Sequence, residues 1–142
     1  MITVRHLLDR KGRAIYSVSP TDPVLAAIRL MADHHIGALL VMQGETLAGI
    51  ISERDYARKV ILLARAADST PVSQIMSSPV TTVAPADSVD QCMRIVTEHR
   101  IRHLPVVENN RVVGVISIGD LVKAVIEDQQ HTIEQLESYI HS

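Results

Sequence analysis

Apolar residues change their spacing along the chain in an order that occurs twice. In each half they first recur every three or four residues, which predicts an amphipathic helix of about three turns. The residues at this spacing are Val24, Ile28 and Met31, and then Val89, Met93 and Val96. Two short apolar runs separated by a polar turn follow each helix, which predicts a β-hairpin. The runs cover residues 38–42 and 47–52 in the first half and 104–107 and 112–117 in the second.

Shorter signals complete the predicted unit. Short strands are expected at residues 15–18 and 80–83, and a Thr or Asp beside Pro or Ser is expected to cap the helix that follows each. Asp55 and Asp120 are expected to be the N-caps of a further helix after each hairpin. The second of these helices continues through Val122 and Ile126 toward Ile140. Each half is therefore predicted to have the element order β-α-β-β-α.

The two halves are copies of one another without a gap. Asp55 recurs as Asp120, an offset of 120 − 55 = 65 residues, and the residues before it match at the same offset. A half of about 60 residues buries a marginal core, so we expect the halves to pack sheet to sheet about a pseudo-twofold axis in an α/β (α+β) fold. The expected divisions are a first repeat 1–65, a linker 66–71, a second repeat 72–128 and a helical extension 129–142. The segments 4–8 and 72–76 also look related, with extra residues 10–13 in the first copy.

Composition narrows the possible partners. The net charge of −2, three Tyr and no Trp or Phe disfavour nucleic acid, which is bound by basic surfaces and stacking aromatic rings. The apolar runs are too short for a membrane span. One cysteine and no signal-peptide pattern favour a reducing cytoplasm.

The most specific motif is Gly-hydrophobic-hydrophobic-Ser-x-x-Asp, present as Gly49–Asp55 and again as Gly114–Asp120. A carboxylate at a helix start can accept two hydroxyl hydrogens from a cis-diol, and a neighbouring Ser with free helix N–H groups suits a phosphate oxygen. Alone, such an Asp is more often only a helix cap, but its duplication favours binding.

With this motif in both copies, the chain resembles the paired cystathionine-β-synthase-type domains, or Bateman modules. The resemblance implies an adenine nucleotide such as AMP, ATP or NAD, with the Asp on the ribose and the Ser on phosphate or ribose. It also implies a cleft that combines the motif of one repeat with the middle strand of the other. For the first motif, the implied nucleotide-binding residues are Ser52, Arg54, Asp55, Val80, Ile101, Arg102 and His103.

The opposite cleft is expected to be empty or to hold a weaker ligand. Its residues would be Gly37, Ala38, Ser117, Gly119 and Asp120. This set contains no cation, whereas Arg54, Arg102 and His103 suit a phosphate chain through charge-assisted hydrogen bonds. The alternative for Arg102 and His103 is a solvated strand end.

Catalysis is not expected. The histidines lack metal-ligand spacing, Cys92 lies among helix positions that suit a packed thiol, and no phosphate-binding or nucleophile motif occurs. We therefore expect a regulatory nucleotide-binding module that acts on another protein and has no metal.

The alternative is a structural dimerisation adaptor without a physiological ligand. Relatives of this kind commonly dimerise, and Ile133, Leu136 and Ile140 form an apolar stripe suited to a homodimer contact. The same stripe could instead cover the core of this chain.

Overall fold

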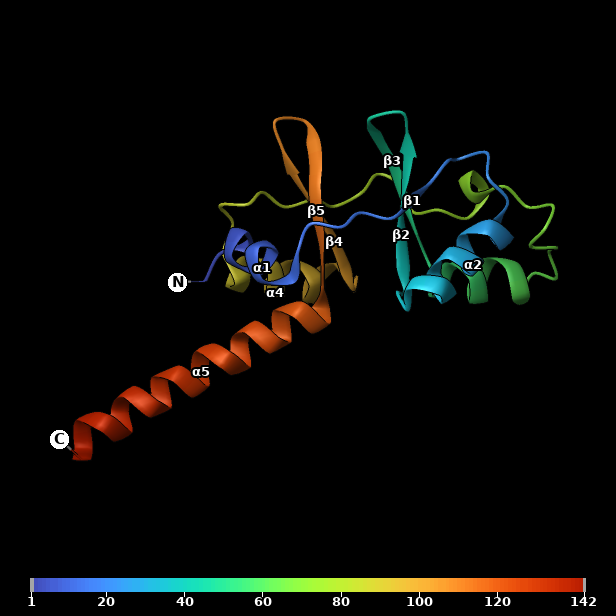
Figure 1. Ribbon diagram of the computed structural model, residues 1–142. Helices are drawn as coiled ribbons and strands as arrows, with labels where there is room; N and C mark the ends of the chain where they lie inside the picture. The colour runs from blue at the N-terminus through green and yellow to red at the C-terminus, as the bar shows by residue number, and fades with distance from the viewer. Residues whose placement is uncertain (1, 142) are drawn as a thin grey trace. The chain divides into compact units, whose positions relative to one another are not determined.

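Two compact units make up the computed structural model, which describes residues 2–141 (Figure 1). The first unit consists of residues 15–81, and the second of residues 2–14 and 82–141. Both mix short strands with helices, so the α+β class and the two repeats are confirmed. The predicted packing of sheet against sheet stays a prediction.

The first unit contains a three-stranded sheet in the order β1-β2-β3. β1 runs parallel to β2, and β2 and β3 form the predicted hairpin. The strands are β1 (Ser17–Val18), β2 (Ala38–Gln43) and β3 (Thr46–Ser52). The helices are α2 (Val24–His34), α3 (Glu53–Tyr56) with its π-helical continuation η1 (Ala57–Ile61), and the 3-10 turn η2 (Val72–Gln74).

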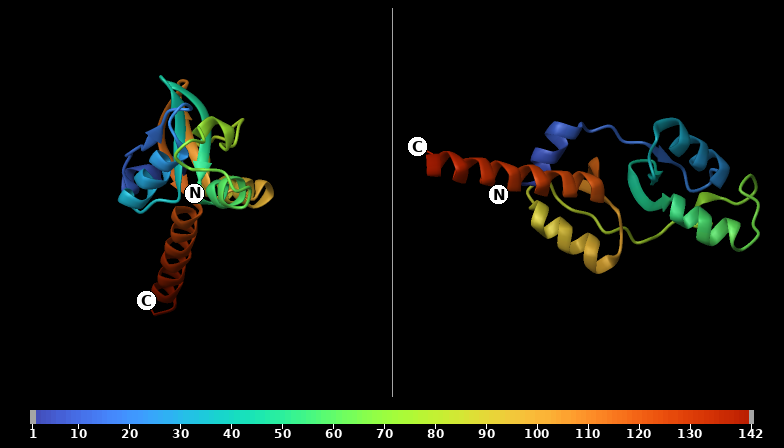
Figure 2. Two further views of the ribbon diagram at one scale, coloured as in Figure 1. Left: turned by 90° about the vertical axis from the view of Figure 1, so that its right-hand side faces the viewer. Right: turned by 90° about the horizontal axis from the view of Figure 1, so that it is seen from below.

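The second unit repeats this plan with one strand fewer. Its elements are α1 (Val4–Lys11), α4 (Val89–His99), β4 (His103–Glu108), β5 (Arg111–Ser117) and α5 (Ile118–His141). The strand expected at 80–83 is reduced to a single parallel bridge between Val83 and Val106. Both hairpins carry an irregularity at the same repeat position, between Val41 and Met42 and between Val106 and Val107. Figure 2 shows α4 beside the first turns of α5, which is the contact that closes this unit's core.

The helix caps differ from those expected. α2 begins after Pro23 without a side-chain cap, and α4 is capped by Ser88, whose hydroxyl accepts from the Gln91 N–H. Asp22 and Asp87 act one turn earlier, where their carboxylates accept from the N–H groups of Ser19 and Ala84. These aspartates therefore stabilise the turn before each helix, a role that short acidic side chains fill well.

Each unit is completed by the leading segment of the other repeat. Val4, Leu7 and Leu8 of α1 belong to the core of the second unit, which is built mainly from the second repeat. Val72 and Ile75, at the start of the second repeat, belong to the core of the first unit. The compact units thus exchange the segments that precede their repeats.

The exchanged segments meet equivalent glycines. A Cβ added at Gly114 would lie 2.6 Å from Leu8 Cδ2, and one added at Gly49 would lie 2.6 Å from Met76 Sδ. Such distances are far inside van der Waals contact. Glycine in the motif therefore serves close packing of the exchanged segment against the hairpin.

The segment between the repeats is ordered by hydrogen bonds. Thr70 is buried, its hydroxyl donates to the Ala66 carbonyl, and its own carbonyl accepts from the N–H of Val24. The Ala67 carbonyl likewise accepts from Leu25 N–H. These bonds satisfy free N–H groups at the start of α2, the role that a side-chain cap would otherwise fill. Among the helices the structure describes, none is long and apolar enough to cross a membrane.

We predict that Leu8→Ala destabilises the second unit by about 3 kcal/mol, because it opens a cavity beneath Gly114. Hydrogen exchange should show lost protection in β4, β5 and α4, with little change in β2 and β3. The exposed Arg5→Ala on the same helix is the control. Protection lost first in β2 and β3 would contradict the assignment of α1 to the second unit.

Candidate functional site

The predicted motif forms a reciprocal pair of hydrogen bonds at the end of β3. Ser52, not Asp55, is the N-cap of α3, and Asp55 is the third helical residue. The Asp55 N–H donates to Ser52 Oγ over 3.1 Å, and the Ser52 N–H donates to Asp55 Oδ2 over 3.0 Å. The expectation that Asp55 caps the helix was therefore wrong by three residues, because the shorter serine reaches the free N–H groups and the aspartate reaches back.

The second motif has the same geometry. Asp120 N–H donates to Ser117 Oγ over 3.2 Å, and Ser117 N–H donates to Asp120 Oδ2 over 2.8 Å. The expected cap at Asp120 is corrected in the same way, since the helix begins at Ile118, before Asp120. Both carboxylates are thus fixed at a strand-to-helix junction.

Each aspartate also faces a lysine. Lys59, one turn along the same helix, lies 3.2 Å from Asp55 Oδ1 and donates to the carbonyl of Ile75. Lys11, from the exchanged helix α1, lies 2.6 Å from Asp120 Oδ2 and donates to the carbonyl of Val115. Partial burial opposes the ionisation of Asp120, but the hydrogen bonds from Lys11 and Ser117 outweigh it, so the pKa of Asp120 lies below its usual value.

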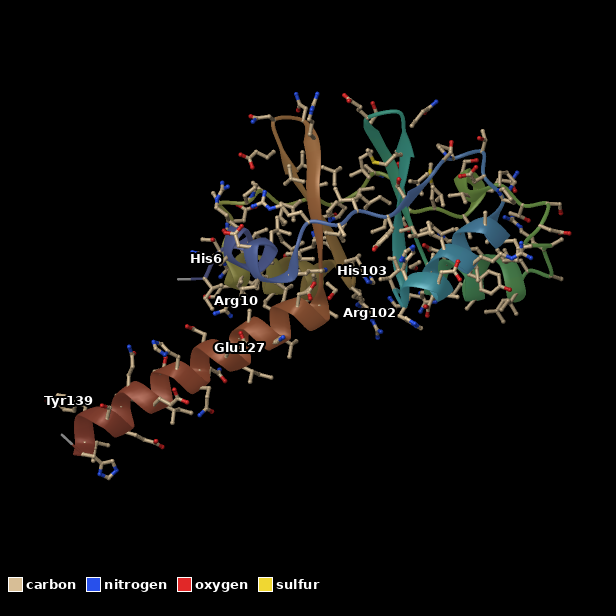
Figure 3. All side chains as sticks on the ribbon, viewed as in Figure 1. His6, Arg10, Arg102, His103, Glu127 and Tyr139 are labelled. Atoms are coloured by element: carbon tan, nitrogen blue, oxygen red, sulfur yellow. The ribbon has the colours of Figure 1, made fainter. Side chains whose placement is uncertain are left out.

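Lys11 corrects the expectation that the Asp120 side lacks cations. It belongs to the extra residues 10–13, which the repeat comparison left without a counterpart. A cavity of about 590 Å³ lies between α1 and α5, and its lining residues are Leu7, Arg10, Lys11, Asp120, Lys123, Ala124 and Glu127. Arg10 and Glu127 form an ion pair across it, and both are labelled in Figure 3.

Arg102 and His103 lie at the start of β4, in the same unit as Asp120 (Figure 3). His103 is paired with Ser117 across the hairpin, and the Arg102 carbonyl accepts from Ile118 N–H. Burial, together with the charges of Lys11 and Arg102, lowers the pKa of His103 against the opposing effect of Asp120. Protonation of the imidazole is therefore disfavoured in the folded protein.

Gly37 and Ala38 occupy the places in the first hairpin that Arg102 and His103 occupy in the second. Ala38 is paired with Ser52, and the Gly37 carbonyl accepts from Glu53 N–H, as Arg102 does in the other hairpin. Val80 follows the cis Ser78–Pro79 peptide bond, Ile101 N–H donates to the Val96 carbonyl, and Gly119 is the second residue of α5. The predicted meeting of Ser52, Arg54 and Asp55 with Arg102 and His103 joins residues of different units and stays a prediction.

The single cysteine is part of the packed core. Cys92 is fully buried in the core, and burial followed by the charge of Asp87 raises its pKa to about 11, so the thiol is packed and protonated. Within residues 2–141, no three His, Cys, Asp or Glu side chains are grouped as metal ligands.

Comparison with known proteins identifies the repeated unit. The family model of the CBS domain matches residues 4–62 and again residues 72–127. The mitochondrial CBS domain-containing protein CBSX3 of Arabidopsis thaliana is 40% identical over 97% of this chain and 71% of its own length. The CBS domain-containing protein YhcV of Bacillus subtilis is 34% identical over 80% of each chain.

Solved structures agree with these matches. A putative signal-transduction protein with CBS domains from Burkholderia ambifaria superposes with a TM-score of 0.86 at 52% identity, covering 89% of this chain and 96% of that one. A CBS domain protein from Pyrobaculum aerophilum complexed with AMP superposes with a TM-score of 0.75 at 28% identity, covering 84% and 89%.

We predict that acidification destabilises the protein through His103. Its lowered folded pKa means that the unfolded chain binds the proton first, so stability is lost as pH falls through the ordinary histidine range near 6.5. The unfolding free energy measured in urea between pH 7.5 and pH 5.5 should fall less in His103→Gln than in the wild type. An equal fall in both proteins would show that His103 does not contribute.

Proposed function

The chain belongs to the CBS-domain family, and from that premise we propose that it is a regulatory module that binds an adenine nucleotide without changing it chemically. The observation that carries the proposal is the reciprocal Ser–Asp pair, built identically at Ser52–Asp55 and Ser117–Asp120. The related protein from Pyrobaculum aerophilum, whose structure holds AMP, supports the choice of ligand. AMP, ATP and NAD share the adenosine group that such a site would bind.

The Ser52–Asp55 pair suits a ribose because its carboxylate is already oriented. A carboxylate has about four acceptor positions, and Ser52 and Lys59 use only part of them at Asp55. A ribose hydroxyl can donate to the remaining position. Lys59, on its flexible stem, is then free to turn toward a neighbouring oxygen of the ligand.

We place the stronger site at Asp55, with Ser52, Arg54, Val80, Ile101, Arg102 and His103 as its other residues. Two arginines can contact phosphate oxygens bidentately, which makes them stronger phosphate ligands than a single ammonium. At Asp120 the cation Lys11 is already bound to the carboxylate and to the Val115 carbonyl. Lys59 is bound in the same way to Asp55 and to the Ile75 carbonyl, so the difference lies in the arginines. We therefore propose that Gly37, Ala38, Ser117, Gly119 and Asp120, a set without an arginine, form the weaker site.

We also propose that the chain forms a homodimer, that it regulates a partner protein and that it is located in the cytoplasm. A structural adaptor, the competing function, would bind no nucleotide. Equilibrium dialysis against AMP, ATP and NAD separates the two, and chromatography of ATP after incubation tests for catalysis. Binding with unchanged ATP supports the regulatory module, and turnover of ATP contradicts it.

Asp55→Asn should weaken AMP binding at least tenfold, because it removes one charge-assisted acceptor contributing about 1.5–3 kcal/mol. Asn keeps an oxygen for the Ser52 N–H, so the thermal unfolding midpoint should hardly change. Asp120→Asn is the matched control and should alter the strong affinity by less than about threefold, well under one such hydrogen bond. Isothermal titration in which only Asp120→Asn loses binding would place the strong site in the other cleft.

AMP should bind at least tenfold more tightly than adenosine, because Arg54, Arg102 and His103 are proposed to contact its phosphate. Added salt should narrow the difference by screening the charges of the two arginines. Arg102→Ala should remove most of the preference, whereas Arg94→Ala, an exposed arginine on α4, should leave it intact. Equal affinities for AMP and adenosine in the wild type would locate the phosphate away from these residues.

A further inference from the structure

The C-terminal part of α5 carries apolar side chains that the second unit does not bury. Leu121 and Ala124 are the buried residues of this helix, and both lie in its first two turns. Beyond them the helix extends away from the rest of its unit (Figure 1). Ile126, Ile133, Leu136 and Ile140 have exposed fractions of 59%, 47%, 58% and 75%. The stripe therefore does not cover the core of the unit that carries it.

These side chains follow the spacing of a coiled-coil seam. Val122, Ile126, Gln129, Ile133, Leu136 and Ile140 are separated alternately by four and three residues. This alternation keeps all six on one face of the helix and places isoleucine at each a position from Ile126 onward. Most of the stability of a helix in a protein comes from packing of its amphipathic face. A second helix with the same spacing would bury the seam.

The seam is complementary to itself in the antiparallel direction. With a twofold axis near residue 131, Ile126 faces Leu136 of a second copy, and Val122 faces its Ile140. Gln129 then faces Ile133 in the two layers next to the axis, so the centre of the seam pairs a polar with an apolar side chain. Val122, Ile126, Leu136 and Ile140 gain apolar neighbours in this register.

Residues that flank the seam select the same direction. In an antiparallel pair, Lys123 lies beside Glu137 of the second copy. Two symmetry-related ion pairs result, as expected for a twofold interface in which one patch meets itself. In a parallel pair, Lys123 would meet Ile118 and Glu137 would meet Thr132, so neither charge would gain a partner.

We propose that α5 pairs antiparallel with α5 of a second copy of the chain, through the seam from Val122 to Ile140. The seam is about 28 Å long at 1.5 Å per residue. It buries on the order of 1,000 Å², the lower limit for a specific interface, as expected for a weak and reversible dimer. This inference does not rest on the proposed nucleotide binding.

Sedimentation equilibrium of the full chain without nucleotide tests the seam. The wild type should show a monomer–dimer equilibrium, and Ile133→Asp should raise its dissociation constant more than about 50-fold, because it buries two carboxylates at the centre. Ser138→Asp places the same charge on the opposite face and should change the constant less than about twofold. Circular dichroism of the three proteins verifies that the folds are equivalent. A monomeric wild type, or an Ile133→Asp dimer of unchanged affinity, overturns the proposal.

A charge exchange tests the direction. Lys123→Glu and Glu137→Lys should each weaken the dimer about fivefold, because each sets like charges together at two symmetric places. The double variant restores both ion pairs and should return the dissociation constant to within about twofold of the wild type. Single variants without effect, or a double variant that is not restored, overturn the antiparallel arrangement.

Discussion

Each half of this protein depends on the hydrogen bonds between a serine and an aspartate three residues apart. At that point the chain leaves the second hairpin strand and enters a helix, and four N–H groups would otherwise lack acceptors. Ser52 and Ser117 supply an acceptor to the helix, and Asp55 and Asp120 accept from the last strand residue. The same bonds hold each carboxylate in one orientation, so the feature that ends the hairpin also prepares an acceptor for a ligand.

The two halves share this junction but differ in the charge around it. At Asp55 the cation comes from the same helix, four residues along. At Asp120 it comes from α1, 109 residues earlier in the chain. A ligand that competes for Asp120 therefore acts on the attachment of α1 to the hairpin, whereas a ligand at Asp55 acts through Lys59 on its bond to the Ile75 carbonyl. Ligand binding at the two equivalent motifs would therefore alter different contacts.

Local pattern was sufficient to predict most of the elements. The hairpins follow from apolar runs around polar turns, and α5 follows from apolar residues that continue past Asp120. The exchange of Val4–Leu8 with the segment at Val72 was not predictable, because both segments have similar apolar spacing and fit either hairpin. Lys11 was missed for the same reason, since a neighbour from a distant segment leaves no local signal. The caps were misplaced because an aspartate suits both the N-cap and the third helical position.

The exchanged segments also bear on how such a chain can be divided. A cut between residues 66 and 71 would give two pieces that each contain one repeat, yet each piece would lack the helix or turn that covers its own glycine and hairpin. The half containing Gly114 would lose Leu8, and the half containing Gly49 would lose Met76. Although the sequence is a duplication, its compact units are offset from its repeats, so a single repeat copied without the segment that follows or precedes it would need another chain to supply that segment.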